Sequence, residues 1–246
     1  MKTLISFPRS GSHWLMTLVD MSVNHKVEWQ HLHDIKFNNH WELAKVADFK
    51  DGFKPILTPH YLDIVYGDHD HKIDKFVFLY RKDVPSVVYS YLKWLQCPAT
   101  KENILRIAVA YYDYIKEWKA FISRTKYPHG LNQPPRSIVV TYEDLSRATQ
   151  ETLDKILEFY DFDKNLIKKF DVKKVDKQQV RDYISHTDER HIPIVDCSED
   201  YQMQKEEFFQ QFGSFIDCLS QNRSNLPSIF KLGSTKPIEY DYEKCS

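Results

Sequence analysis

The chain of 246 residues balances 34 Lys and Arg against 35 Asp and Glu, and its formal net charge of −1 excludes the basic excess typical of nucleic-acid binders. Its 42% hydrophobic and 14% aromatic residues exclude a disordered chain and predict one globular domain over residues 1–246. It has only six glycines, no two of them close together. This excludes both the G-x-G-x-x-G dinucleotide fingerprint and the G-x-x-x-x-G-K-[ST] phosphate loop.

The predicted elements begin with a strand, a tight loop and a helix. The apolar run 4–7 predicts a buried strand that ends at Pro8, and apolar residues at helical spacing predict a helix over 14–21. Residues 25–50 show no clean period, and 55–58 predict a second strand.

The strongest strand prediction covers 75–80, and helices over about 84–95 and 103–124 follow it. A further strand is predicted at 137–141. The rest of the chain comprises a helix with Leu153, Ile156, Leu157 and Tyr160 on one face, helical segments near 175–184 and 202–218, and an aperiodic stretch, 231–246, that suits a tail or a lid. Strands that alternate with helices predict an α/β fold with a central parallel sheet flanked by helices.

The cysteines and histidines indicate neither a disulfide scaffold nor a metal site. Cys97, Cys197, Cys218 and Cys245 lie far apart without a C-x-x-C spacing, so we expect reduced thiols in a cytoplasmic protein. Two H-x-H pairs, His31/His33 and His69/His71, lack a third ligand placed by the sequence, so we expect solvated histidines. No run of about eighteen apolar residues occurs, and no membrane partner is expected.

The loop after the first strand has the composition of an anion site. Ligands of α/β folds bind at the carboxyl ends of strands, and backbone N–H groups at the start of a helix attract anions. Gly11 permits a tight turn, Ser10 and Ser12 offer hydroxyl groups, and Arg9 adds a permanent positive charge. The alternative is an ordinary strand-to-helix turn with a serine cap and a solvated arginine.

The segment Pro8-Arg9-Ser10-Gly11-Ser12-His13-Trp14 resembles the 5′-phosphosulfate loop of sulfotransferases that use 3′-phosphoadenylyl sulfate. Three further segments match that family in the same order: Arg81 to Ser90, Thr141-Tyr142-Glu143-Asp144-Leu145, and His60 after the second strand. The resemblance implies a nucleotide-kinase-like fold, with donor and acceptor meeting above the strand ends. It covers roughly residues 1–24 and 54–160, with gaps.

The resemblance implies how the donor, whose product is adenosine 3′,5′-bisphosphate, would be bound. Arg9 and the backbone from Ser10 to His13, with Gly11 and Ser12 between them, would hold the 5′-phosphosulfate, and Arg9 would help catalysis electrostatically. Trp14 would stack on the adenine, although a core aromatic is the alternative, and Tyr142 would contact the adenine edge.

The 3′-phosphate would be bound by Arg81 and Ser90, with Ser86 as the fallback because the gap from Arg81 to Ser90 is one residue longer than the family's usual spacing. The family's C-terminal R-K-G motif is absent. Arg181 and Arg190 lie in roughly the right region to replace it.

His60 is the candidate base for the acceptor hydroxyl, because an imidazole titrates near neutral pH. Here Leu57-Thr58-Pro59-His60 lacks the lysine that family members commonly carry two residues before this histidine. The alternative is a loop histidine without a role.

The sequence thus predicts sulfuryl transfer to a hydroxyl, or an amine, of a small-molecule acceptor without a metal. Two rivals stay open: a nucleotide-kinase-like phosphotransferase, whose loop lysine is missing, and a non-catalytic nucleotide-binding or anion-binding module. The segments 25–50 and 61–73, with the C-terminal third, are expected to set the acceptor, which is not readable, and oligomeric state is open.

Overall fold

The computed structural model describes residues 2–7, 9–23, 29–30, 56–57, 75–95, 97–123, 136–147, 149–168, 170, 203–226 and 240–245. The chain forms two compact units. The sheet unit comprises Met1–Tyr80 and Ala120–Arg190, and the helical unit comprises Arg81–Lys119 and His191–Ser246. The prediction of a single domain over 1–246 stays a prediction.

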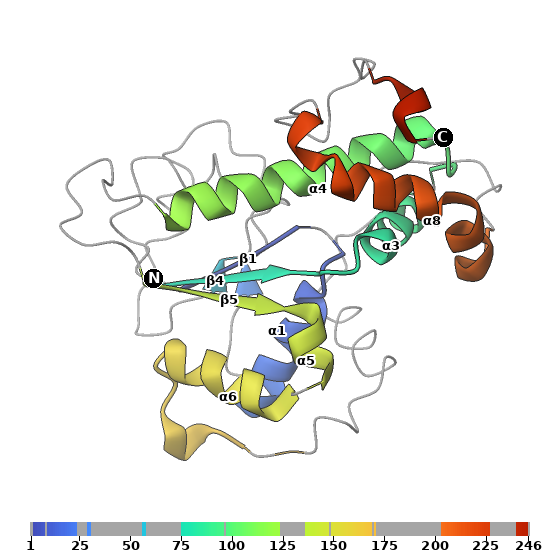
Figure 1. Ribbon diagram of the computed structural model, residues 1–246. Coiled ribbons are helices and arrows are strands. Elements are labelled where there is room, and N and C mark those ends of the chain that lie inside the picture. The colour runs from blue at the N-terminus through green and yellow to red at the C-terminus, as the bar shows by residue number, and fades with distance from the viewer. Residues whose placement is uncertain are drawn as a thin grey trace. The chain divides into compact units, whose positions relative to one another are not determined.

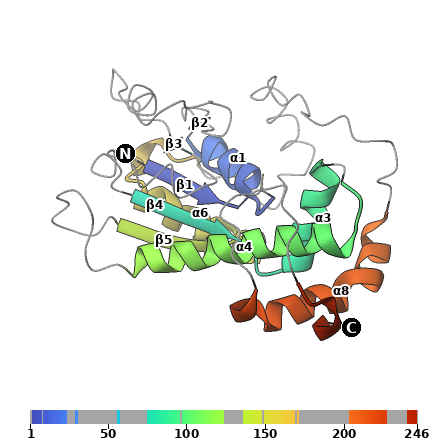
Figure 2. The same cartoon turned by 90° about the horizontal axis from the view of Figure 1, so that it is seen from above.

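The sheet unit is built on five parallel strands (Figure 2). They lie in the order β2-β3-β1-β4-β5. Their bounds are Lys2–Ser6 for β1, Trp29–Gln30 for β2, Ile56–Leu57 for β3, Lys75–Tyr80 for β4 and Arg136–Thr141 for β5. The parallel sheet confirms the predicted α/β class. The sequence predicted four of these strands and missed β2, whose two residues are too few to show a period.

The strand order creates a switch point between β1 and β4. From β1 the chain goes on to β2 on one side of the sheet, whereas from β4 it goes on to β5 on the other side. The two strands are neighbours, with Ser6 paired to Leu79 near their carboxyl ends. Ligands of open α/β sheets bind outside the carboxyl ends of strands at such a point. The residues that follow β1 and β4 are therefore candidates for binding a ligand.

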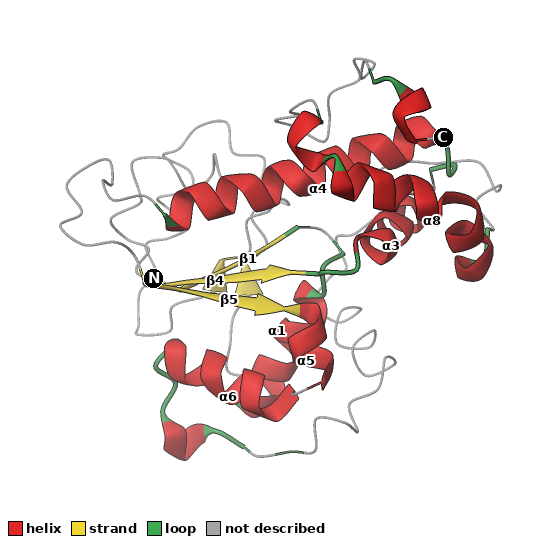
Figure 3. Cartoon of the chain, viewed as in Figure 1, coloured by secondary structure: helices red, strands yellow, loops and turns green. Residues whose placement is uncertain are grey.

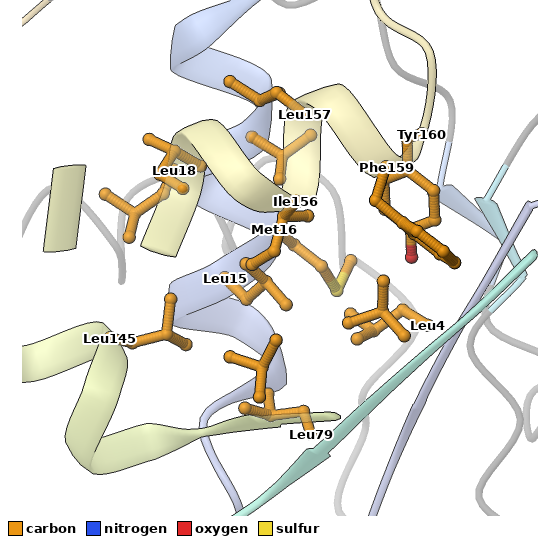
Figure 4. Packing of buried hydrophobic residues seen from close by; sticks show 14 of the residues in the cluster. Leu4, Leu15, Met16, Leu18, Leu79, Leu145, Ile156, Leu157, Phe159 and Tyr160 are labelled. Carbon is orange, nitrogen blue, oxygen red and sulfur yellow. The ribbon is translucent and has the colours of Figure 1, made fainter. Parts of the chain in front are cut away.

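Three helices of the sheet unit cover one face of the sheet (Figures 1 and 3). They are α1 (Ser12–Ser22), α5 (Tyr142–Arg147) and α6 (Thr149–Phe159), and a short 3₁₀ helix, η5 (Lys164–Leu166), follows. Figure 4 shows how their apolar side chains meet those of the strands. The buried cluster includes Leu4, Leu15, Leu18, Val77, Leu79, Leu145, Ile156, Leu157 and Tyr160. Burial of each of the large aliphatic side chains stabilises the unit by about 1.5–3 kcal/mol.

The strands are apolar on both faces. Ile5, Phe76 and Phe78 point away from that cluster and are also almost completely buried. Strands of parallel sheets are buried on both sides, which is why 4–7 and 75–80 appear in the sequence as continuous apolar runs.

The helical unit contains α3 (Val84–Leu95), most of α4 (Lys101–Ile122) and α8 (Lys205–Gln221). Aromatic side chains join α3 to α8, since the ring of Tyr89 lies 5.3 Å from that of Phe208. Two short 3₁₀ helices, η7 (Arg223–Asn225) and η8 (Tyr242–Cys245), follow α8. Within the described ranges, none of the helices has the length and apolar character needed to span a membrane.

A disulfide joins Cys218 of α8 to Cys245 of η8, so the expectation of four reduced thiols is wrong for this pair. The two cysteines are 27 residues apart, and folding brings them together because η8 packs on α8, with the Phe215 and Tyr242 rings 6.2 Å apart. Sequence spacing does not reveal such a pair. Cys97 forms no disulfide within the described residues, and Cys197 lies outside them. The stretch 231–246 was predicted as a tail or a lid. Its described residues, 240–245, include η8, which packs on α8 and is joined to it by the disulfide.

Candidate functional site

The loop between β1 and α1 has an unusual backbone. Arg9 has φ 67° and Gly11 has φ 98°, so two of its residues adopt the left-handed conformation. The N–H of Ser10 donates to the carbonyl of Phe7 at 3.2 Å and closes the turn. A left-handed conformation costs a residue with a side chain about 1–2 kcal/mol, so the strain lies at Arg9. Such strain is concentrated at functional sites.

Ser10 carries an unsatisfied hydroxyl. The side chain is completely buried, and its Oγ has no hydrogen-bond partner within the described part of the chain. A buried hydroxyl without a partner costs about 1–3 kcal/mol, and buried polar groups in folded proteins are nearly always satisfied. The hydroxyl can therefore donate a hydrogen bond to an acceptor that the described residues do not supply.

The amino end of α1 follows directly. Gly11 is its N-cap, and the first turn holds no acidic residue. No side chain in the described ranges caps this end. The N–H of Leu15, which donates to the carbonyl of Gly11 at 3.1 Å, begins the helical ladder. The uncapped end of a helix attracts anions through its N–H groups and its dipole.

Tyr142 lies against this loop, at the start of α5. A Cβ built on Gly11 would lie 2.4 Å from Cδ2 of Tyr142, which no real side chain could occupy. The backbone of Asp144 donates to Oγ1 of Thr141 at 3.1 Å and anchors the beginning of α5. The structure thus brings together Gly11 and Tyr142, two predicted site residues that are distant in the sequence.

The other predicted residues of the loop differ in exposure. Arg9 is exposed, but the protein around its guanidinium removes part of the hydration, and this burial lowers its pKa below the ordinary value. An arginine still carries its charge at neutral pH. Ser12, His13 and Trp14 are half-buried, and Trp14 packs against the apolar cluster of the sheet unit. This packing agrees with the alternative given above for Trp14, that of a core aromatic.

Arg81, the first residue of the helical unit, follows β4 immediately. Its backbone N–H donates to the hydroxyl of Tyr111 at 3.0 Å, and that hydroxyl donates in turn to the carbonyl of Arg81. Its guanidinium lies 3.6 Å from the carboxylate of Asp83, and its side chain is 18% exposed. Both its backbone and its side chain are therefore held within the helical unit.

Asp83 caps α3. One carboxylate oxygen accepts from the N–H of Ser86 at 3.1 Å, and the other accepts from the Ser86 hydroxyl. Ser86, the fallback ligand, is 2% exposed and donates its hydroxyl to protein. Ser90 lies one helical turn further along α3 and is half-buried.

Some predicted residues lie outside the described residues: Pro8, His60, Arg181, Arg190, and the pairs His31/His33 and His69/His71. Sequence reasoning missed two residues in contact with Arg81. Asp83 could have been found from the sequence, because aspartate is a preferred N-cap residue and it directly precedes the predicted helix start at residue 84. Tyr111 could not, because its partner is thirty residues away. Within the described ranges, no group of three or more His, Cys, Asp and Glu could hold a metal ion.

No protein-family model and no curated protein matches the chain. Among solved structures, it is similar to mouse sulfotransferase SULT7A1 complexed with PAP, at 15% identity and a TM-score of 0.48 over 75% of this chain. It is also similar to two structures of retinol dehydratase. With the complex that contains androsterone and inactive cofactor PAP, the identity is 13% and the TM-score 0.45 over 74% of this chain. With the complex that contains retinol and PAP, the identity is 15% and the TM-score 0.44 over 75% of this chain. The aligned part spans 63% of the length of each of these proteins.

Proposed function

We propose that the chain is a sulfotransferase that takes the sulfuryl group of 3′-phosphoadenylyl sulfate. The proposal rests on the buried hydroxyl of Ser10, which has no partner within the described residues and lies in a loop with the sequence P-R-S-G-S-H-W. The loop leads into an uncapped helix end at the switch point of the sheet, where a phosphate oxygen would supply the missing acceptor.

The nucleotide product, adenosine 3′,5′-bisphosphate (PAP), has two phosphates, and the proposal assigns one to each of two segments. The 5′-phosphate binds to the Ser10 hydroxyl and the first N–H groups of α1. The ring of Tyr142, which packs on Gly11, borders the same loop and suits the adenine edge. Arg81 binds the 3′-phosphate together with Ser90, because the Ser86 hydroxyl is already bonded to Asp83.

The reaction needs positioning and charge stabilisation more than covalent chemistry by the protein. An acceptor oxygen attacks sulfur in line, the new S–O bond forms, and the bond from sulfur to the 5′-phosphate oxygen breaks. That leaving oxygen gains negative charge, which the Arg9 guanidinium and the loop N–H groups stabilise. Arginine cannot donate a proton, so its help is electrostatic. His60, assigned from the sequence, accepts the proton of the acceptor hydroxyl. The acceptor is a small molecule.

The test uses Ser10→Ala, with Ser22→Ala as its control. Both serines are buried in the sheet unit, but Ser22 donates to the carbonyl of Leu18 at 2.8 Å. Ser10→Ala removes an unsatisfied group, so we expect unchanged or higher stability and PAP affinity about tenfold weaker by calorimetry without magnesium. Ser22→Ala should lower stability by about 1 kcal/mol and leave PAP affinity unchanged.

The same calorimetry separates the rivals. Binding of ATP but not of PAP would favour the phosphotransferase. Binding of PAP with no acceptor-dependent release of PAP from 3′-phosphoadenylyl sulfate, across a panel of phenols, alcohols and amines, would favour the non-catalytic module. Equal PAP affinity in Ser10→Ala and the parent would remove the loop from the binding site.

A further inference from the structure

We propose that Tyr111 is a positioning residue that sets the selectivity of the protein for a nucleotide with a 3′-phosphate. The inference rests on the proposed function, in which Arg81 binds that phosphate. Tyr111 acts through Arg81, by fixing the backbone from which the guanidinium extends.

The contact between them is reciprocal. The Tyr111 hydroxyl accepts from the N–H of Arg81 at 3.0 Å and donates to the carbonyl of the same residue. A tyrosine hydroxyl can do both at once, and here it satisfies both backbone groups of one residue. Arg81 is the first residue after Tyr80, whose pair with Thr141 is the last one between β4 and β5, so it lies just beyond this sheet pairing.

The hydroxyl is itself held in place. Tyr111 is 2% exposed on α4, and its ring lies 6.0 Å from that of Tyr112 and 6.4 Å from that of Tyr114. A buried ring with aromatic neighbours has few rotamers, so its oxygen marks a fixed point. Arg81 is thereby tied to the middle of a long helix.

The other end of Arg81 is guided separately. Asp83 lies 3.6 Å from the guanidinium, and Ser86 holds the Asp83 carboxylate through two hydrogen bonds. The carboxylate orients the head of the side chain, whereas Tyr111 fixes its root. A guanidinium binds two phosphate oxygens well only in one orientation, and displacement of a binding group by about 1 Å can cost up to a hundredfold in rate.

The experiment compares Tyr111→Phe with Tyr112→Phe. In Tyr112→Phe the neighbouring tyrosine also loses a partly buried hydroxyl bond, to Ser220 of α8, but within the described residues that hydroxyl does not bond to Arg81. Each variant is titrated by calorimetry with PAP and with AMP, which lacks the 3′-phosphate. We expect Tyr111→Phe to weaken PAP binding about tenfold and to leave AMP binding unchanged, while Tyr112→Phe changes neither. Phenylalanine keeps the ring and its packing, and thermal unfolding verifies that both variants are folded.

The outcomes separate the inference from the function beneath it. A parent protein that binds PAP no more tightly than AMP, or binds neither, overturns the assignment of Arg81 and with it the proposed function. A parent that prefers PAP, together with a Tyr111→Phe variant that keeps the full preference, overturns the inference alone. Equal weakening of PAP and AMP shows a general structural role for Tyr111 and also overturns it.

Discussion

Two segments that follow neighbouring strands are built in opposite ways. The loop after β1 leaves the Ser10 hydroxyl unsatisfied within the described residues, leaves the start of α1 without a side-chain cap, and holds Arg9 in a strained conformation. In the segment after β4, the Tyr111 hydroxyl bonds to the backbone N–H and carbonyl of Arg81, and the Asp83 carboxylate lies 3.6 Å from the Arg81 guanidinium.

Under the proposed function, the difference gives two ways to bind a phosphate. In the first loop the Ser10 hydroxyl has no partner within the described residues, so under the proposed function a phosphate oxygen adds a hydrogen bond there without displacing one. In the second segment the Asp83 carboxylate already lies near the Arg81 guanidinium, so the proposed 3′-phosphate would meet an oriented guanidinium but also a like charge. We expect changes in the first loop to affect binding most strongly.

The largest effect is expected from Gly11→Ala. The new Cβ would lie 2.4 Å from the Tyr142 ring, and the backbone at φ 98° disfavours any side chain. We expect a loss of about 2–4 kcal/mol in the free energy of unfolding, measured with urea, and no measurable PAP binding.

Gly213→Ala is the matched control, because nothing lies within 4 Å of a Cβ added at that position of α8. It should raise stability by up to about 1 kcal/mol and leave PAP affinity unchanged. If Gly11→Ala binds PAP like the parent, the fixed geometry of the first loop is not required for binding.

A smaller effect is expected from Asp83→Asn in the second segment. Asparagine caps a helix as well as aspartate does, so α3 should keep its stability. Removal of the negative charge 3.6 Å from the Arg81 guanidinium should tighten PAP binding about threefold at low salt and leave AMP binding unchanged. Weaker PAP binding would mean that orientation by the carboxylate outweighs its repulsion of the phosphate.

The last effect is on stability rather than on binding, and it concerns alkaline pH and the sheet unit that carries the first loop. Complete burial raises the pKa of Tyr160 well above 10.0, so the folded state keeps a proton that the unfolded state loses. Its contribution to stability is therefore complete below pH 10 and is lost as the pH rises toward the folded pKa. The free energy of unfolding of the parent, measured with urea, should fall by up to about 1.4 kcal/mol per pH unit above pH 10. In Tyr160→Phe this decrease with pH should be smaller. The same slope in both proteins would assign the alkaline loss to other groups.

The fold could be predicted from the sequence because the strongest signals in the sequence are local. Apolar runs at 4–7 and 75–80 reflect burial on both faces of β1 and β4, and helical periods marked α3, α4 and α8 to within a few residues. The turn after β1 was equally predictable, because the positive φ of Gly11 is a local property for which glycine is suited; binding of a phosphate by this loop stays a prediction.

What the sequence could not supply depends on distant partners. Nothing local shows that Tyr142 packs on Gly11, that Tyr111 bonds to Arg81, or that Cys245 reaches Cys218. These contacts arise only once the helices pack, and they are set by tertiary geometry rather than by spacing. The roles of His60 and Ser90 stay predictions.

The conformation of Arg9 has a consequence for how this loop could change over evolutionary time. At φ 67°, glycine or asparagine would be less strained than arginine, so selection for stability alone would favour their appearance at this position. Stability alone does not explain an arginine at this position. Its retention would mark lineages that still need the charge, and its replacement by glycine would mark relatives whose loop has become only a turn.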